Sequence, residues 1–169
     1  MDNKAEQKVF YREDGSKIGI LTYKEGCPFN GIFIEIEERM GISITGQYKN
    51  GRKIKTWKAV QQDTLLWQKK YKAGFRTGKW YKYNQKTCTK TFVHFKNNKM
   101  NGWYTEYTTK KLSWAKKRYI LRSFFRKLPW VAITKGKYKD DKKTGKWVYR
   151  DREGNIIRTE FWNYGVLKQ

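Results

Sequence analysis

The sequence is poor in the residues on which most catalytic and metal sites depend. Its 169 residues contain one histidine, His94, and two cysteines, Cys27 and Cys88. Two distant cysteines provide neither a metal-ligand spacing nor a disulfide framework. A lone histidine in the alternating segment TFVHFK is typical of a packed or surface strand residue, and no Ser or Cys motif stands near it. We therefore expect no catalytic residue, no metal site and no cofactor.

Long apolar runs are absent as well. No stretch approaches the roughly 18 apolar residues that a membrane-spanning helix requires. The first ten residues, MDNKAEQKVF, carry acidic residues where a secretory signal has an apolar segment. These two absences favour a soluble, cytoplasmic protein without a transmembrane segment. With only two prolines, a chain of this length is expected to fold as one domain, 1–169.

Acidic residues are scarce in one part of the chain only. The net charge is +24 overall, but it is −2 over residues 1–45, +22 over residues 46–135 and +4 over residues 136–169. Charge segregated in this way indicates a polyanionic or strongly acidic partner. The alternative is a Lys-rich composition without function. The acidic cluster Glu35, Glu37 and Glu38 is interpreted as a solvated face or as a contact for the basic middle of the chain.

What the chain has in abundance is aromatic residues, and these recur at regular intervals. Trp57, Trp80 and Trp103 follow one another at 23 residues, and Phe33 precedes Trp57 by 24. Trp130 and Trp147 continue the series at intervals of 27 and 17 residues, the second of which suggests a shortened hairpin. A fixed period in the low twenties indicates a stacked repeat architecture. The aromatic residue of each unit is then expected to form the core.

Each unit is predicted to be one β-hairpin. Segments such as GKWYKY alternate with a period of two and are rich in strand-forming residues, and turn residues such as YNQK, QQD and DREGN separate them. Gly near each turn supplies a positive φ. The sequence therefore predicts an all-β fold with a single elongated antiparallel sheet of consecutive hairpins. The predicted structural positions are Gly31, Phe33, Trp57, Gly78, Trp80, Gly102, Trp103, Trp130, Gly145 and Trp147.

The segments NGIFIEI, YKNGRKIKTW, GFRTGKWYKY, MNGWYTEY and TGKWVYR…EGNII resemble MORN repeats, and most closely a bacterial variant of them. The resemblance covers most of residues 29–165, and residues 1–28 would form a degenerate or capping first unit. Lys55 stands where Gly is expected, and Leu128 and Pro129 replace Gly-Lys before Trp130. The resemblance implies an antitoxin or immunity protein that binds a toxin-like partner.

One segment permits a second interpretation. Residues 111–128, KLSWAKKRYILRSFFRKL, can form either strands or a short basic amphipathic helix that ends at Pro129. Such a helix would suit an anionic membrane surface or the groove of a partner.

The predicted function is non-catalytic binding through a basic, aromatic-rich sheet. An acidic, toxin-like protein is the first partner, because charge steers and selects such complexes. Nucleic acid is the alternative, since Lys and Arg neutralise phosphates while aromatic rings stack on bases. Anionic phospholipid is a further one, with contact at 110–130. Self-association through edge strands is the last, since an open repeat sheet exposes them, although the net charge should oppose it at low salt. The predicted partner-binding residues are Arg76, Lys79, Lys82, Lys116, Lys117, Arg118, Arg122, Arg126 and Lys146.

Overall fold

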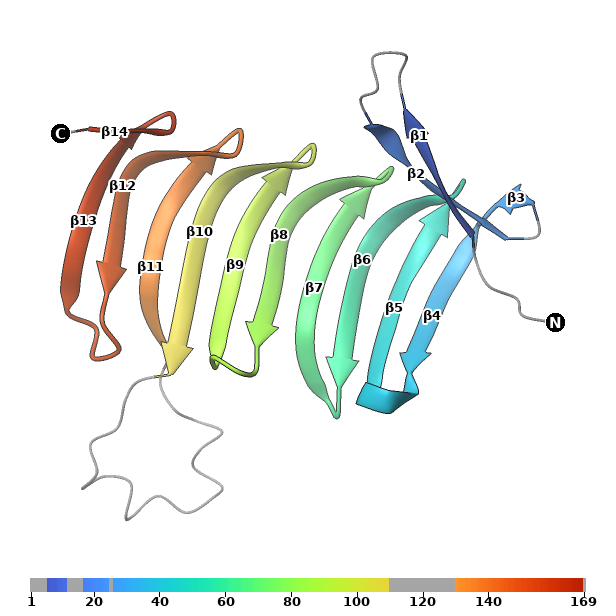
Figure 1. Ribbon diagram of the computed structural model, residues 1–169, viewed down its shortest axis with the longest axis horizontal. Coiled ribbons are helices and arrows are strands. Elements are labelled where there is room, and N and C mark those ends of the chain that lie inside the picture. Colours follow the sequence, from blue (N-terminus) through green and yellow to red (C-terminus); the bar gives the residue numbers. More distant parts are fainter. Residues whose placement is uncertain (1–5, 12–16, 25, 110–129, 169) are drawn as a thin grey trace. The chain divides into compact units, whose positions relative to one another are not determined.

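The computed structural model describes residues 6–11, 17–24, 26–109 and 130–168, and all their regular structure apart from one short 3-10 helix is β. The strands are β1 (Glu6–Tyr11), β2 (Lys17–Lys24), β3 (Cys27–Pro28), β4 (Gly31–Glu37), β5 (Ile42–Lys49), β6 (Arg52–Gln61), β7 (Thr64–Lys72), β8 (Phe75–Asn84), β9 (Thr89–Lys96), β10 (Lys99–Thr109), β11 (Trp130–Lys139), β12 (Lys142–Arg150), β13 (Ile156–Asn163) and β14 (Val166–Leu167). The 3-10 helix, η1, spans Glu38–Met40. Strands β4 to β14 form one open antiparallel sheet in sequence order (Figure 1), which confirms the predicted sheet of consecutive hairpins.

Two-residue turns at one end of the strands provide the repeat. Both residues have positive φ in the turns 50–51, 73–74, 97–98, 140–141 and 164–165. This is the geometry of type I′ turns, whose twist matches that of the adjoining strands. Their sequences are Asn-Gly, Ala-Gly, Asn-Asn, Asp-Asp and Tyr-Gly, so only some of them carry the usual glycine signature.

Each of these turns is hydrogen-bonded to the unit before it. The second turn residue donates its backbone N–H to a carbonyl at the start of an earlier hairpin strand, over distances of 2.8 to 3.1 Å. The pairs are Gly74–Lys53, Asn98–Arg76, Asp141–Met100 and Gly165–Lys143, and in the first turn Gly51 donates instead to Phe29 O, just before β4. Asn98 and Asp141 also accept the N–H of Arg76 and Met100 through their side chains. These repeated bonds hold successive hairpins in register.

The sheet divides into two compact units, residues 1–80 with 95–98 and residues 81–94 with 99–169. In the first unit the core is a row of aromatic rings on one side, which we call the Trp57 face. Trp57 is 2 % exposed and contacts Phe33, Tyr48 and Tyr71 at centroid distances of 4.9 to 6.4 Å. The row continues from Tyr71 to Trp80 and Phe95. Aromatic burial therefore stabilises this unit.

The β1–β2–β3 sheet belongs to the first unit. Its buried Thr22 donates a backbone N–H to Gly51 O and accepts one from Phe29, so β2 lies against the end of the aromatic row.

In the second unit Trp147 fills the place that Trp57 has in the first. Trp147 is 1 % exposed, contacts Tyr104 and Tyr138, and donates its indole N–H to Lys137 O. Burial beside Glu106 raises the pKa of Tyr104 to about 12. We call this side of the second unit the Trp147 face.

Two predicted core positions were wrong. Trp103 is 46 % exposed, and its neighbour Tyr104 takes the core position instead. Trp130 is the first residue of β11 and does not hold the core position on the second strand of a hairpin. Trp130 and Trp147 therefore lie on the two strands of one hairpin of full length, and no shortened hairpin separates them. The extra spacing comes from residues 110–129, which lie between the paired strands β10 and β11 and outside the described residues, as does the strand-or-helix alternative for 111–128.

Candidate binding face

The candidate site lies on the side of the second unit that is opposite the Trp147 face. Directly paired residues of antiparallel strands share one side of a sheet, and successive residues alternate. On this side the pairs are Trp103–Lys137, Thr105–Lys135, Tyr107–Ala132, Lys135–Val148, Lys146–Phe161 and Val148–Thr159. We call it the Trp103 face. Ring contacts and cation–π contacts add Tyr81, Tyr83, Lys90, Phe92 and Trp130.

Trp103 is an exposed indole between two ammonium groups. The Nζ atoms of Lys137 and Lys135 lie 4.4 Å and 5.1 Å from its ring centroid, and both lysines are exposed. The pairing of β10 with β11 brings them together, because Trp103 lies opposite Lys137. Such cation–π contacts orient the ammonium groups along the ring while they remain open to solvent.

The backbone under Trp103 is held firmly. His94 Nδ1 lies 3.2 Å from Trp103 O. Gly102, at φ +116°, brings the chain so close to β9 that an added Cβ would lie 3.0 Å from His94 Cβ. The backbone at Gly102 therefore leaves little room for a side chain, as expected of a structural glycine. The core aromatic residue of this repeat is Tyr104 and not Trp103. The indole of Trp103 thus projects from a strand whose backbone is tied to β9, and such preorganisation lowers the entropic cost of binding.

A second basic and aromatic cluster lies on the same face. Lys90 Nζ is 3.8 Å from the ring centroid of Trp130, and Tyr83 packs edge-on against that ring at 6.2 Å. Partial burial lowers the pKa of Lys90 from its ordinary value. Between this cluster and Trp103, Phe92 contacts both Tyr81 and Tyr107. The face therefore has an aromatic centre with cations around it.

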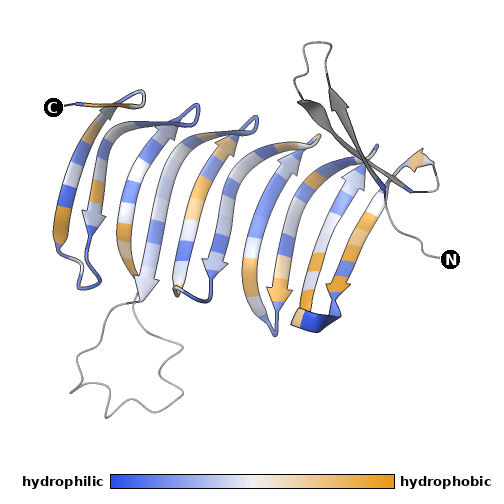
Figure 2. Ribbon diagram, viewed as in Figure 1, coloured by the Kyte–Doolittle hydropathy of each residue, from blue (hydrophilic) through white to orange (hydrophobic). Residues whose placement is uncertain are grey.

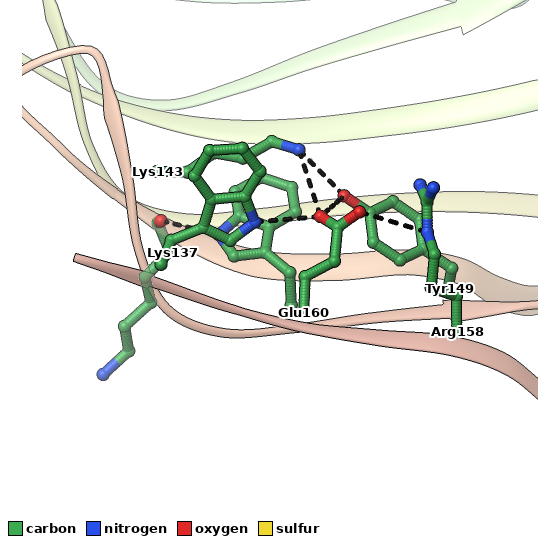
Figure 3. A network of polar contacts seen from close by, with 7 residues as sticks. Lys137, Lys143, Tyr149, Arg158 and Glu160 are labelled. Atoms are coloured by element: carbon green, nitrogen blue, oxygen red, sulfur yellow. Dashed lines mark hydrogen bonds and ion pairs between the residues drawn. The ribbon is translucent and has the colours of Figure 1, made fainter. Parts of the chain in front are cut away.

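None of the described residues that we assign to the Trp103 face is acidic. The carboxylates of β10 and β13, Glu106 and Glu160, lie on the Trp147 face. There Glu160 accepts hydrogen bonds of 2.8 Å from Tyr149 and Trp162, and forms ion pairs with Arg158 at 3.1 Å and Lys143 at 3.6 Å (Figure 3). Its charge is thus neutralised within the Trp147 face, while the positive charge of the Trp103 face is left for a partner.

The structure does not place the predicted binding residues on one side of the sheet. Arg76 donates to Asn98 O at 2.6 Å and lies over the Phe95 ring, so it serves the fold. Lys79 and Lys82 are exposed, but they point to opposite sides of the sheet because they are an odd number of residues apart on β8. Lys82 shares the side of Trp80. Lys146 is exposed on the Trp103 face. Lys116, Lys117, Arg118, Arg122 and Arg126 lie outside the described residues.

Sequence reasoning missed three cations of this face: Lys90, Lys135 and Lys137. A signal existed for two of them. Lys135 and Lys137 alternate with Gly136 and Tyr138, and Tyr138-Lys139 has the same place before its turn as Tyr48-Lys49. Aligning on that dipeptide predicts that Tyr138 faces the core and that Lys135 and Lys137 face the other way.

No three His, Cys, Asp or Glu side chains of the described residues gather into a cluster that could hold a metal ion. Among the same residues, no helix is long and apolar enough to cross a membrane. In comparisons with known proteins, no family model and no curated protein matches this sequence.

Proposed function

We propose that this chain is a non-catalytic binding protein that holds an acidic partner protein against the Trp103 face. The observation that carries the proposal is Trp103 itself, a residue 46 % exposed whose indole is flanked by Lys135 and Lys137. Trp is one of the residues most enriched among interface hot spots. The absence of described carboxylates from this face favours an acidic surface on the partner.

An inhibitor role is what the MORN resemblance implies. A toxin is neutralised when a rigid surface covers its active site, and such a surface needs complementary shape and charge rather than catalytic groups. The aromatic centre around Phe92 would supply apolar contacts, and the lysines around it would steer association. We therefore propose an antitoxin or immunity role in which the Trp103 face covers an acidic site on the toxin.

The test begins with the full chain as bait in its native host. Capture is carried out at low and at high salt, with and without nuclease, and the retained protein is identified. We expect an acidic protein that remains bound at high salt, since apolar contacts are not screened, and whose expression alone arrests growth. Co-expression of this chain should restore growth, whereas the Lys135→Glu/Lys137→Glu variant should not. A control variant, Lys86→Glu, changes an exposed turn lysine and should rescue fully.

Nucleic acid remains the second candidate because Trp103 and its two lysines could also stack on a base and neutralise phosphates. The two candidates differ in salt dependence. A complex with single-stranded DNA should lose affinity log-linearly as salt rises. Nuclease-sensitive capture together with such a slope would replace the protein-partner proposal. The phospholipid alternative depends on residues 110–130, nearly all of which are outside the described part of the chain.

A further inference from the structure

Strand β4 exposes an apolar row at the edge of the sheet. Ile32, Ile34 and Ile36 are 72 %, 65 % and 67 % exposed. They share one side of the strand because successive residues of a strand alternate in side, and hydrophobic segments run along β4 (Figure 2). Within the described residues β4 pairs only with β5, so its other edge offers free backbone groups. Edges of this kind are templates for a further strand, and proteins usually block them with Lys, Pro or bulges. β4, GIFIEIE, contains neither Lys nor Pro.

Strand β13 has a similar open edge. Lys168 donates its N–H to Phe161 O, so β14 and the residue after it cover β13 only as far as Phe161. Residues 156–160 have no further strand beside them in the described part of the chain. Ile157 and Phe161 are 68 % and 53 % exposed. Thr159 and Phe161 belong to the Trp103 face, whereas the Arg158 side chain points to the Trp147 face and is 61 % exposed.

From these two edges we infer that copies of this chain associate head to tail, with β4 of one copy paired with β13 of the next. The strand directions permit this. Strands alternate in direction from β4 to β13, so these two strands run antiparallel to each other when a second copy continues the sheet. Because antiparallel neighbours share a side, Ile34 then lies opposite Thr159, and Ile36 lies opposite Ile157. Glu35 lies opposite Arg158 on the other side.

Charge selects this pairing over the symmetric one. Two β4 strands side by side would bring together the acidic residues Glu35, Glu37 and Glu38 of both copies, and like charges across a pair are destabilising. Residues 1–45 carry a net charge of −2, and residues 46–169 carry a net charge of +26. The head of one copy is therefore electrostatically complementary to the tail of another, and this offsets part of the repulsion between two basic chains. A heterologous contact of this kind adds copies successively.

Disulfide trapping tests the register. In a background with Cys27→Ser and Cys88→Ser, one batch carries Glu35→Cys and a second carries Arg158→Cys. Directly paired Cα atoms of antiparallel strands are about 4.5–5.5 Å apart, within reach of a disulfide. We expect disulfide-linked dimers when the two batches are mixed under mild oxidation, and none from either batch alone. Lys58→Cys, on an inner strand, replaces Glu35→Cys as the control and should give no dimer.

Sedimentation of the unmodified chain gives an independent measurement. The mass is expected to rise with protein concentration, and Ile34→Lys should weaken the association by about tenfold or more. Thr45→Lys is the matched control, because Thr45 pairs with Ile34 on the same side but belongs to an inner strand. A chain that sediments as a monomer up to its solubility limit would overturn the inference. Dimers from Glu35→Cys alone would also overturn it, in favour of symmetric β4 pairing.

Discussion

Gly136 lies directly beneath the indole of Trp147. A Cβ added to Gly136 would lie 2.2 Å from Trp147 Cδ2, closer than two carbon atoms can approach. Gly46 and Trp57 show the same relationship in the first unit, at 2.1 Å. In each unit a glycine on the first hairpin strand thus makes room for the core tryptophan of the second.

Gly136→Ala should therefore be strongly destabilising, because the indole must leave its place or the strands must separate. We expect a loss of about 3 kcal/mol in the free energy of unfolding, measured by urea denaturation. In the Trp147→Leu background, the added Gly136→Ala change should cost less than it does in the wild type, since the smaller side chain leaves space for the methyl group. Equal and additive losses would show that the close packing is not the cause.

Lys55→Gly should stabilise the protein. Lys55 has a φ of +56°, two residues before Trp57, where Gly78 and Gly145 hold the same place before Trp80 and Trp147. A left-handed backbone conformation costs a residue with a Cβ about 1 kcal/mol of folding stability, and it costs glycine nothing comparable. Because Lys55 is exposed, few contacts are lost. We expect a gain of about 0.5–1 kcal/mol in chemical denaturation after the greater unfolded-state entropy of glycine is subtracted.

Gly145→Ala is the reverse control. An added Cβ at Gly145 would contact nothing within 4 Å, and its φ is +66°, so backbone strain alone should destabilise the variant by about 1 kcal/mol. If Lys55→Gly destabilises the protein, the backbone account of this repeat position is wrong.

Stability should fall at acid pH because of Glu160. Its hydrogen bonds from Tyr149 and Trp162, together with the nearby Arg158 and Lys143, hold the pKa of its carboxyl below the ordinary value of 4.5. The stabilisation is complete above that value and is lost as the pH falls toward the lower pKa of the folded state. Glu160→Gln should lower stability at neutral pH and make the acid side of the stability profile shallower. The matched variant Glu153→Gln removes an exposed carboxylate of the adjoining turn and should leave the profile unchanged; similar profiles for both variants would exclude this role of Glu160.

Much of the fold could be predicted from the sequence, because the repeat is written in residues with strong local preferences. The alternation of GKWYKY and the glycine before Trp80 and Trp147 identified hairpins with an aromatic core, and Trp57 and Trp147 are indeed nearly fully buried. The spacing predicted the wrong core residue in the repeat that follows Trp80, which is 24 residues long and not 23. Counting 23 residues from Trp80 selected Trp103, although strand alternation buries only one of two adjacent aromatic residues, here Tyr104.

The turns contain the more reliable signal. Tyr48, Tyr71, Phe95 and Tyr138 each precede a two-residue turn by two positions, and the core ring follows nine residues later, at Trp57, Trp80, Tyr104 and Trp147. Counted in this way, Trp130 is no repeat position. The turn sequences Asn-Asn and Asp-Asp concealed the pattern, because they adopt positive φ without glycine.

The candidate face was less predictable than the fold. Net charge located the basic part of the chain but could not show that Arg76 is used by Asn98, or that Lys79 and Lys82 differ in parity along β8. Those facts depend on bulges and on long-range pairing, which composition does not contain. The pairing of β10 with β11, across 20 intervening residues, is what brings Lys137 to Trp103.

The central claim is that Trp103 and its two lysines are the centre of a binding surface for an acidic protein. The most direct measurement is the dissociation constant of the purified partner for the wild type and for Trp103→Ala, at low and at high salt. Loss of a hot-spot Trp costs about 2 kcal/mol or more, so we predict affinity about 30-fold weaker at both salts, with unchanged unfolding and with Lys86→Glu binding like the wild type. Wild-type affinity in the Trp103→Ala variant would contradict the account.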